Sequence, residues 1–209
     1  MRDRREEAEA VDWQAVEWSY FAWRWQMSVP AHPRGIDHVG LTVPDLEAAS
    51  RFLEEALGAI PLYDVQAPDA PPMAGAAAEK QLGLPSGAKI VHMRLLRVGE
   101  GPSLELFQVA DASQRGAAAL PDLGLQHIAL YVDDIDEAAA RFEAAGGELL
   151  SSPNALVGAE AAPRNRWLYG RTPWGTLIEL ITYPDGVKVP NATPGRWTPP
   201  QAGAPADRV

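Results

Sequence analysis

The sequence contains no cysteine, and this absence limits the chemistry that the chain can perform. Disulfides and thiolate-bound zinc are excluded, so any metal ion must bind to histidine and carboxylate side chains. The sequence also lacks an apolar run long enough to span a bilayer, and its first residues lack the apolar segment of a signal peptide. We therefore expect a cytoplasmic protein that does not bind membranes.

Basic residues are in the minority, because 18 Lys and Arg stand against 28 Asp and Glu and the formal net charge is -10. Such an acidic chain is unsuited to nucleic acid, whose phosphates it would repel. An anionic small molecule can still bind where a local basic pocket overrides the average. Hydrophobic residues make up 46% of the chain, which is enough for a packed core.

The two ends of the chain differ in composition from its middle. Residues 1–34 contain four of the seven tryptophans, and we expect a helix from about Glu6 to Gln26 that buries them against the rest of the chain or a second subunit. This cluster favours a homodimer. Residues 185–209 are rich in proline and show no apolar periodicity, so we expect an extended tail.

The middle of the chain repeats itself. The segment GIDHVGLTVPDLEAASRFLEEALGA, which begins at Gly35, returns at Gly124 as GLQHIALYVDDIDEAAARFEAAGGE. In both copies apolar residues first alternate as in a strand, an acidic turn then caps a helix, and a glycine (Gly58 or Gly147) ends it. The apolar faces of the two predicted helices are Leu46, Ala49, Leu53 and Ala56 in the first copy and Ile135, Ala138, Phe142 and Ala145 in the second.

Each copy closes with a predicted hairpin: AKIVHMRLLRV and LELFQV in the first, RNRWLYGR and LIELITY in the second. The order strand, helix and three strands, given twice, predicts an α+β fold. Its two βαβββ modules, at 35–110 and 124–184, would form a curved mixed sheet around a cleft. The first module carries an insertion around 65–86, where we expect a long loop with a short helix at Ala76–Leu82 that covers the cleft.

Four side chains occupy matching places in the two copies. His38 and His127 begin the first strands, and Glu105 and Glu179 lie in the last strands, within LEL and IEL. Strand side chains alternate between faces, so apolar neighbours that pack on the helix leave these four in the cleft. Carboxylates gathered in a cleft need compensation, and a divalent cation bound by two imidazoles and two carboxylates supplies it.

Further cleft residues follow from the same alternation. If the apolar side chains of the third strand pack on the helix, His92 and Arg94 face the cleft, and so does Arg166, which matches His92 in the second copy. An inward arginine could clamp a substrate carboxylate or phosphate, or form salt bridges at the rim instead. The aromatic residues nearby are expected to pack rather than to bind substrate: Trp167, Tyr169 and Trp174.

This doubled arrangement resembles the vicinal oxygen chelate superfamily of glyoxalases, bleomycin-resistance proteins and dioxygenases, over about 36–110 and 124–184. The resemblance implies one divalent ion (Zn, Ni, Co, Mn or Fe) held by His38, Glu105, His127 and Glu179, in a chain that dimerises. It also implies a lyase, isomerase or epimerase that acts on a small oxygenated substrate through a metal-stabilised enolate. Glu179 is then the catalytic base, with Glu105 the next candidate.

Two other functions fit the same fold. An iron-dependent ring-cleaving dioxygenase would use two histidines and one carboxylate, and the fourth ligand-type residue, Glu105, counts against it. A small-molecule (antibiotic) binding protein without catalysis would not need the four ligand-type residues that this chain retains. The insertion and both terminal extensions depart from the minimal glyoxalases and methylmalonyl-CoA epimerases of the superfamily, so the substrate stays open.

Overall fold

The computed structural model describes residues 33, 35–189 and 197–199 of the chain. The predicted N-terminal helix with its tryptophan cluster, and much of the proline-rich tail, lie outside the described residues. The described residues from Asp37 onward form one unit. Within the described part, no helix has the length and apolar character needed to cross a membrane.

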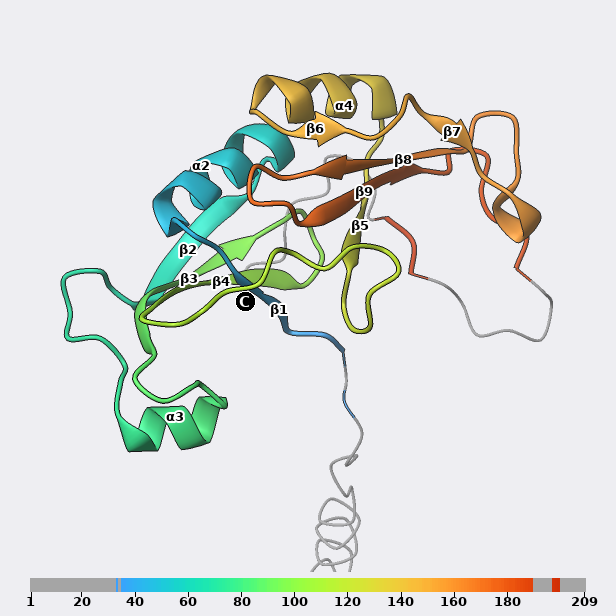
Figure 1. Ribbon diagram of the computed structural model, residues 1–209. Coiled ribbons are helices and arrows are strands. Elements are labelled where there is room, and N and C mark those ends of the chain that lie inside the picture. The colour runs from blue at the N-terminus through green and yellow to red at the C-terminus, as the bar shows by residue number, and fades with distance from the viewer. Residues whose placement is uncertain (1–32, 34, 190–196, 200–209) are drawn as a thin grey trace, which may run out of the picture. The chain divides into compact units, whose positions relative to one another are not determined.

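The first module is built around a sheet with the strand order β1-β4-β3-β2 (Figure 1). Strands β1 and β4 run parallel, and the other neighbours are antiparallel. A helix, α2, follows β1, and the short α3 lies within the insertion, as predicted. The bounds are β1 (His38–Thr42), α2 (Leu46–Leu57), β2 (Ile60–Gln66), α3 (Ala76–Leu82), β3 (Lys89–Arg97) and β4 (Ser103–Ala110).

The second module repeats this plan in a sheet of order β5-β9-β8-β6, with β7 also paired to β8. Its second strand is interrupted between β6 and β7, where Pro153 lacks an N–H group and the Asn154 amide donates to Ser151 Oγ. The predicted α+β fold of two βαβββ-like modules is otherwise confirmed, but the strands form two separate mixed sheets and not the single curved sheet that the sequence predicts. The bounds are β5 (His127–Tyr131), α4 (Ile135–Ala144), β6 (Glu148–Leu149), β7 (Asn154–Ala155), β8 (Arg166–Arg171) and β9 (Leu177–Thr182).

Both long helices begin at the predicted acidic caps. The Asp45 carboxylate accepts a hydrogen bond from the Ala48 N–H at 2.9 Å, and Asp134 does the same for the first turn of α4. Gly58 ends α2 with φ of 66°, a left-handed conformation that glycine adopts without steric cost. In the second module Gly146, rather than the predicted Gly147, takes the positive φ after α4.

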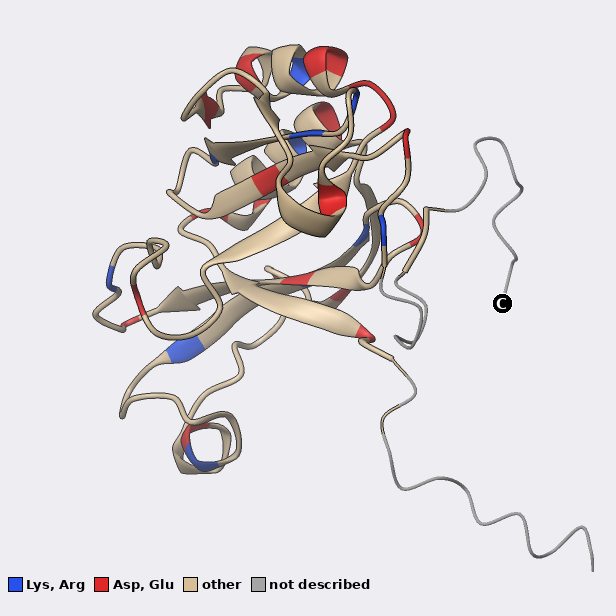
Figure 2. Ribbon diagram, turned by 90° about the vertical axis from the view of Figure 1, so that its right-hand side faces the viewer, with Lys and Arg blue, Asp and Glu red and all other residues tan. Residues whose placement is uncertain are grey.

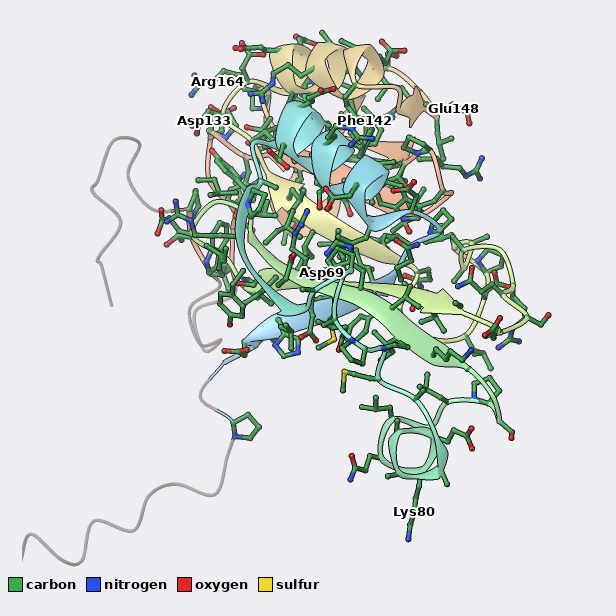
Figure 3. All side chains as sticks on the ribbon, turned by 90° about the vertical axis from the view of Figure 1, so that its left-hand side faces the viewer. Asp69, Lys80, Asp133, Phe142, Glu148 and Arg164 are labelled. Carbon is green, nitrogen blue, oxygen red and sulfur yellow. The ribbon has the colours of Figure 1, made fainter. Side chains whose placement is uncertain are left out.

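A common core joins the two modules through their helices, which lie side by side (Figure 1). Phe142 of α4 (labelled in Figure 3) is fully buried. Its ring meets that of Phe52 in α2 edge-on, with ring centroids 5.3 Å apart. Trp174, from the turn between β8 and β9, packs on the same Phe52 ring at 5.5 Å. Gly170 makes room for this packing, because a Cβ there would lie 2.5 Å from the Phe142 ring. The helix-facing sides of both sheets are therefore committed to one core.

The insertion between β2 and β3 lies largely at the surface. Met73 forms an isolated bridge with Ile90 of β3, which anchors the chain before α3. Strand β2 lies at the edge of its sheet and exposes apolar side chains at both odd and even positions. Their exposed fractions lie between 46% and 59%. These are Ile60, Leu62, Tyr63 and Val65. Exposed apolar residues on an edge strand are typical of a surface that another chain covers.

Candidate metal and substrate site

The first histidine–carboxylate pair lies on the face of its sheet opposite α2. Leu104 and Leu106 are buried in the common core, so Glu105 between them projects to the other face, as predicted. The parallel register of β1 and β4 brings the His38 ring beside it, with Nε2 3.2 Å from Glu105 Oε2. The carboxylate side chain is only 15% exposed, whereas the imidazole is 42% exposed.

The other ring nitrogen of His38 is engaged by the preceding residue. Nδ1 lies 2.7 Å from Asp37 Oδ1. This hydrogen bond is the main cause that raises the pKa of His38, and the negative charges of Glu105 and Asp37 add to it. Because Nδ1 is engaged, Nε2 is the nitrogen available to a metal ion.

The second pair repeats this geometry. Ile178 and Leu180 are buried in the core and turn Glu179 to the opposite face, where its Oε2 lies 3.3 Å from His127 Nε2. The Nδ1 atom of His127 lies 3.0 Å from Gln126 Oε1, so a neutral amide stands where Asp37 stands in the first module. Figure 2 colours the Asp and Glu positions of the described ribbon red and shows acidic positions on both sheets.

Tyr169 joins the second pair, a role that the sequence interpretation missed. It is the register partner of Glu179 across β8 and β9, and its ring meets His127 edge-on at 5.3 Å. Burial raises the pKa of the Tyr169 hydroxyl, and the charge of Glu179 and a hydrogen bond to that carboxylate raise it further. The signal was present in the sequence, because pairing the strands of the second hairpin places Tyr169 opposite Glu179.

The four predicted ligands are not gathered into one cluster. In the part of the chain that the structure describes, no three His, Asp or Glu side chains stand close enough to hold a metal ion together. Each of the four side chains lies on the strand face opposite the helix, but the chain presents them as two separate pairs. The donor set itself suits a divalent ion, since both pairs offer an imidazole nitrogen and a largely buried carboxylate.

A pocket of about 600 Å³ lies next to the second pair. It is bounded by β1, by β5 including His127, and by the segment that links the two modules. Polar groups in its lining can exchange hydrogen bonds with a ligand, and Arg115 supplies a positive charge. These polar residues are Thr42, Gln114, Arg115, Gln126 and Thr176.

The predicted cleft orientation of His92 and Arg94 is wrong. In the antiparallel register Arg94 stands opposite Leu106 and therefore shares its helix-facing side, whereas Leu95 stands opposite Glu105. The Arg94 guanidinium donates to Glu47 and Ser50 of α2. Apolar residues occur at both odd and even positions of β3, so the alternation of its side chains could not predict which face of the strand packs on the helix.

Arg94 instead anchors a charged network beneath α2. Its Nε lies 2.6 Å from Asp64 Oδ1, and its Nη2 lies 2.9 Å from Glu47 Oε1. The buried His92 ring places Nε2 3.3 Å from Asp64 Oδ2. Hydrogen bonds from Arg94 hold the pKa values of Asp64 and Glu47 below their usual range.

Arg166 also departs from its predicted orientation. The register pairs it with Thr182, two residues beyond the Leu168–Leu180 pair that faces the core, so it starts on the helix-facing side of β8. Its Nη1 donates to the Asn165 carbonyl at 2.8 Å. None of the three predicted substrate-binding residues therefore shares the face of the histidine–carboxylate pairs.

Replacing Arg94 with methionine should destabilise the fold, because the variant leaves Asp64 and Glu47 beside α2 without their cation. We expect a loss of about 2 kcal/mol in the free energy of unfolding at neutral pH, less than for a fully buried pair because Glu47 is half exposed. Both carboxyl pKa values are lowered in the folded chain, so this stability is lost as the pH falls below the ordinary carboxyl range of about 4.

Urea unfolding at pH 7 and in acid measures this effect. The difference in the free energy of unfolding between wild type and Arg94→Met should be smaller in acid than at pH 7. Arg97→Met, on the same strand, is the control and should change stability by less than about 0.5 kcal/mol. A gap that is the same at both pH values would mean that lost packing, rather than charge, explains the loss.

Comparison with known proteins by sequence finds one matching superfamily and two similar epimerases. The glyoxalase/bleomycin resistance protein/dioxygenase superfamily matches residues 37–162. A 2-epi-5-epi-valiolone epimerase from Actinomyces sp. is 35% identical over 170 residues, which cover 79% of this chain and 88% of that protein. An ethylmalonyl-CoA/methylmalonyl-CoA epimerase from Cereibacter sphaeroides is 32% identical over 145 residues, with coverage of 69% and 95%.

Solved structures share the fold at lower identity. A glyoxalase family protein from Bacillus cereus aligns with a TM-score of 0.58 and 21% identity, over 74% of this chain and 97% of that one. A glyoxylase/bleomycin resistance protein/dioxygenase domain from Frankia sp. aligns with a TM-score of 0.52 and 20% identity, over 74% and 96%. These likenesses concern the fold alone.

Proposed function

Because the chain belongs to the glyoxalase/bleomycin resistance protein/dioxygenase superfamily, we propose that it is a metal-dependent epimerase of a small oxygenated substrate. Two relatives above 30% identity are named as epimerases, which favours this class over the lyases of the superfamily. The observation that carries the proposal is the pairing of a histidine with a largely buried carboxylate at matching places in both modules.

His38, Glu105, His127 and Glu179 would hold one divalent ion. When bound, such an ion stabilises negative charge that develops on a substrate oxygen. The protein's own task is proton transfer. Epimerisation removes a proton from carbon and returns one to the opposite face, so it needs a group that accepts and a group that donates. Glu179 is our candidate for the group that accepts the proton, and Glu105 is the next candidate for it.

The pocket beside His127 is our candidate for the place where the substrate lies. Its amide and hydroxyl side chains, among them Gln114, Gln126 and Thr176, suit a ligand with several hydroxyl groups. Arg115 could pair with a negative group of the substrate. We therefore propose a hydroxylated carbonyl compound of small size as the substrate class.

We propose that the active form is a homodimer. Each site then combines the first-module pair of one chain (His38 and Glu105) with the second-module pair of the other chain (His127 and Glu179). Within one chain, the described residues bring no three such ligands together, and the core that Phe52, Phe142 and Trp174 form holds the two modules in this arrangement. A second copy would supply the missing pair without a change in that core. The exposed apolar strand β2 offers surface for such an association.

Elemental analysis and an epimerisation assay test the function together. Protein purified without chelator and then supplied with Mn²⁺, Zn²⁺, Co²⁺, Ni²⁺ or Fe²⁺ should hold about one ion per chain and melt at a higher temperature, because the ion binds only the folded state. It should also incorporate deuterium from solvent into 2-epi-5-epi-valiolone or methylmalonyl-CoA, the two substrates tested first.

Each negative outcome points elsewhere. Ring cleavage of a catechol with Fe²⁺ and oxygen would indicate a dioxygenase. Tight binding of an antibiotic by metal-free protein would indicate a binding protein. A chain that binds none of the five ions would remove the metal-dependent proposal.

A further inference from the structure

The outer edge of β1 carries main-chain groups that no described strand uses. Strand β1 stands at the end of its sheet, with β4 as its neighbour. The Val43 N–H donates to the Phe107 carbonyl at 2.8 Å, so the odd-numbered residues of β1 are those that bond to β4. The N–H and C=O groups of Gly40 and Thr42 therefore point the other way, and they have no hydrogen-bond partner among the described residues.

This free edge faces the pocket beside His127. Gly40 and Thr42 line the pocket, and both are exposed. Because Gly40 has no side chain, nothing of its own covers its main chain. The repeat places Ala129 of β5 at the equivalent position, and its N–H also points away from the neighbouring strand. Ala129 does not line the pocket, so the repeat supplies an internal comparison.

The groups along this edge select the chemistry of a ligand. They offer N–H donors and C=O acceptors side by side. A hydroxyl group can accept from the first and donate to the second, whereas a carboxylate or phosphate can only accept. The rest of the lining adds the side-chain amides of Gln114 and Gln126, which also donate and accept. A molecule with several hydroxyl groups therefore fits this lining better than an anion does.

We propose that the substrate is a polyhydroxylated ring whose hydroxyl groups bond to the free edge of β1, with Gly40 and Thr42 as specificity-determining residues. This rests on the proposed function, because it names the substrate class and the contacts of the same pocket. Main-chain groups of a strand are already fixed, so binding to them orders few side chains. The acid and thioester groups of an acyl-CoA are acceptors alone and would leave the carbonyl groups of this edge unpaired.

Amide hydrogen exchange, followed residue by residue by NMR on the full chain, tests this with 2-epi-5-epi-valiolone as the probe. In the free protein the Gly40 and Thr42 amides should exchange quickly, and those of Leu41 and Val43, which bond to β4, slowly. At saturating probe the Gly40 and Thr42 amides should exchange at least about fivefold more slowly, because they are then hydrogen-bonded. Exchange at Ala129 should not change.

Gly40→Pro removes one of these N–H groups without breaking a bond to β4, since the missing donor lies on the outer side of an edge strand. It should weaken binding of the probe, measured by calorimetry, about fivefold, as expected for one hydrogen bond between neutral groups. Gly40→Ala keeps the N–H and adds a methyl group beside the Phe107 ring, so it should bind nearly as the wild type does. Ala129→Pro is the matched control and should also bind as the wild type does.

The exchange measurement needs no variant, so it decides the matter even if Gly40→Pro does not fold. Bound probe without slower exchange at Gly40 and Thr42, or equal losses of affinity in Gly40→Pro and Ala129→Pro, would overturn the inference. Slow exchange at these amides in the free protein would do so too, because another segment or a second copy would then occupy the edge. Epimerisation of methylmalonyl-CoA without binding of the probe would overturn the inference and leave the proposed function intact. Slower exchange without epimerisation of the probe would support the contacts and count against the proposed function.

Discussion

Glu179→Gln protein should keep a measurable share of its metal and lose nearly all of its turnover. The amide can still coordinate weakly, but it cannot accept a proton from carbon. We expect the rate of solvent-deuterium incorporation into the substrate to fall by at least about a hundredfold, the usual contribution of a positioned base. Metal content measured on the same sample separates the loss of the base from the loss of the ion.

Glu105→Gln is the comparison for this variant. It should lose metal first, and added Mn²⁺ should restore part of its activity because the base is intact. Full activity in Glu179→Gln protein that retains its ion would assign the base elsewhere, with Glu105 next. If both variants lose deuterium incorporation in proportion to their metal content, neither carboxylate acts as a base.

Two inactive variants should restore each other when they are expressed together. One carries His38→Ala and Glu105→Ala, and the other carries His127→Ala and Glu179→Ala. If each site takes one pair from each chain, a mixed dimer has one site with all four ligands and one site in which all four are replaced. It should therefore recover about half of the wild-type metal and activity. Each variant alone should recover none.

Two different affinity tags allow the mixed dimer to be purified, and size-exclusion chromatography checks that both variants associate as the wild type does. Sites built within one chain cannot be restored in this way, since every chain then carries a damaged site. Metal-loaded wild-type protein without restoration in the mixed dimer would therefore refute the shared site and leave the four ligands in place.

The orientation of the ligands could be predicted because their strands have an unambiguous pattern. Glu105 and Glu179 each lie between two leucine or isoleucine residues that the core takes up, and only one face is then left for the carboxylate. The acidic caps of the helices could be predicted equally well, because Asp45 and Asp134 each precede a segment of clear apolar periodicity. The same pattern occurs in both copies of the repeat, which supports each of these predictions.

The orientation of β3 could not be predicted from its sequence, because apolar residues occupy both faces of the strand. Only the hairpin register decides that Arg94 joins Leu106 and Leu96 on the helix side. The relation of the two modules was also beyond the sequence pattern. A repeat predicts two similar units, but it does not show which side chains of the units pack against one another, as Phe52 and Trp174 do.

The common core has a consequence for how the chain unfolds. Hydrogen bonding stops at the border of each sheet, which would suggest two halves that melt separately. Yet Phe142 of one half fills space against Phe52 of the other, so loss of either half would uncover apolar surface on its neighbour. Cooperativity is therefore carried by side-chain packing rather than by the backbone ladder, and the described unit should melt in a single transition.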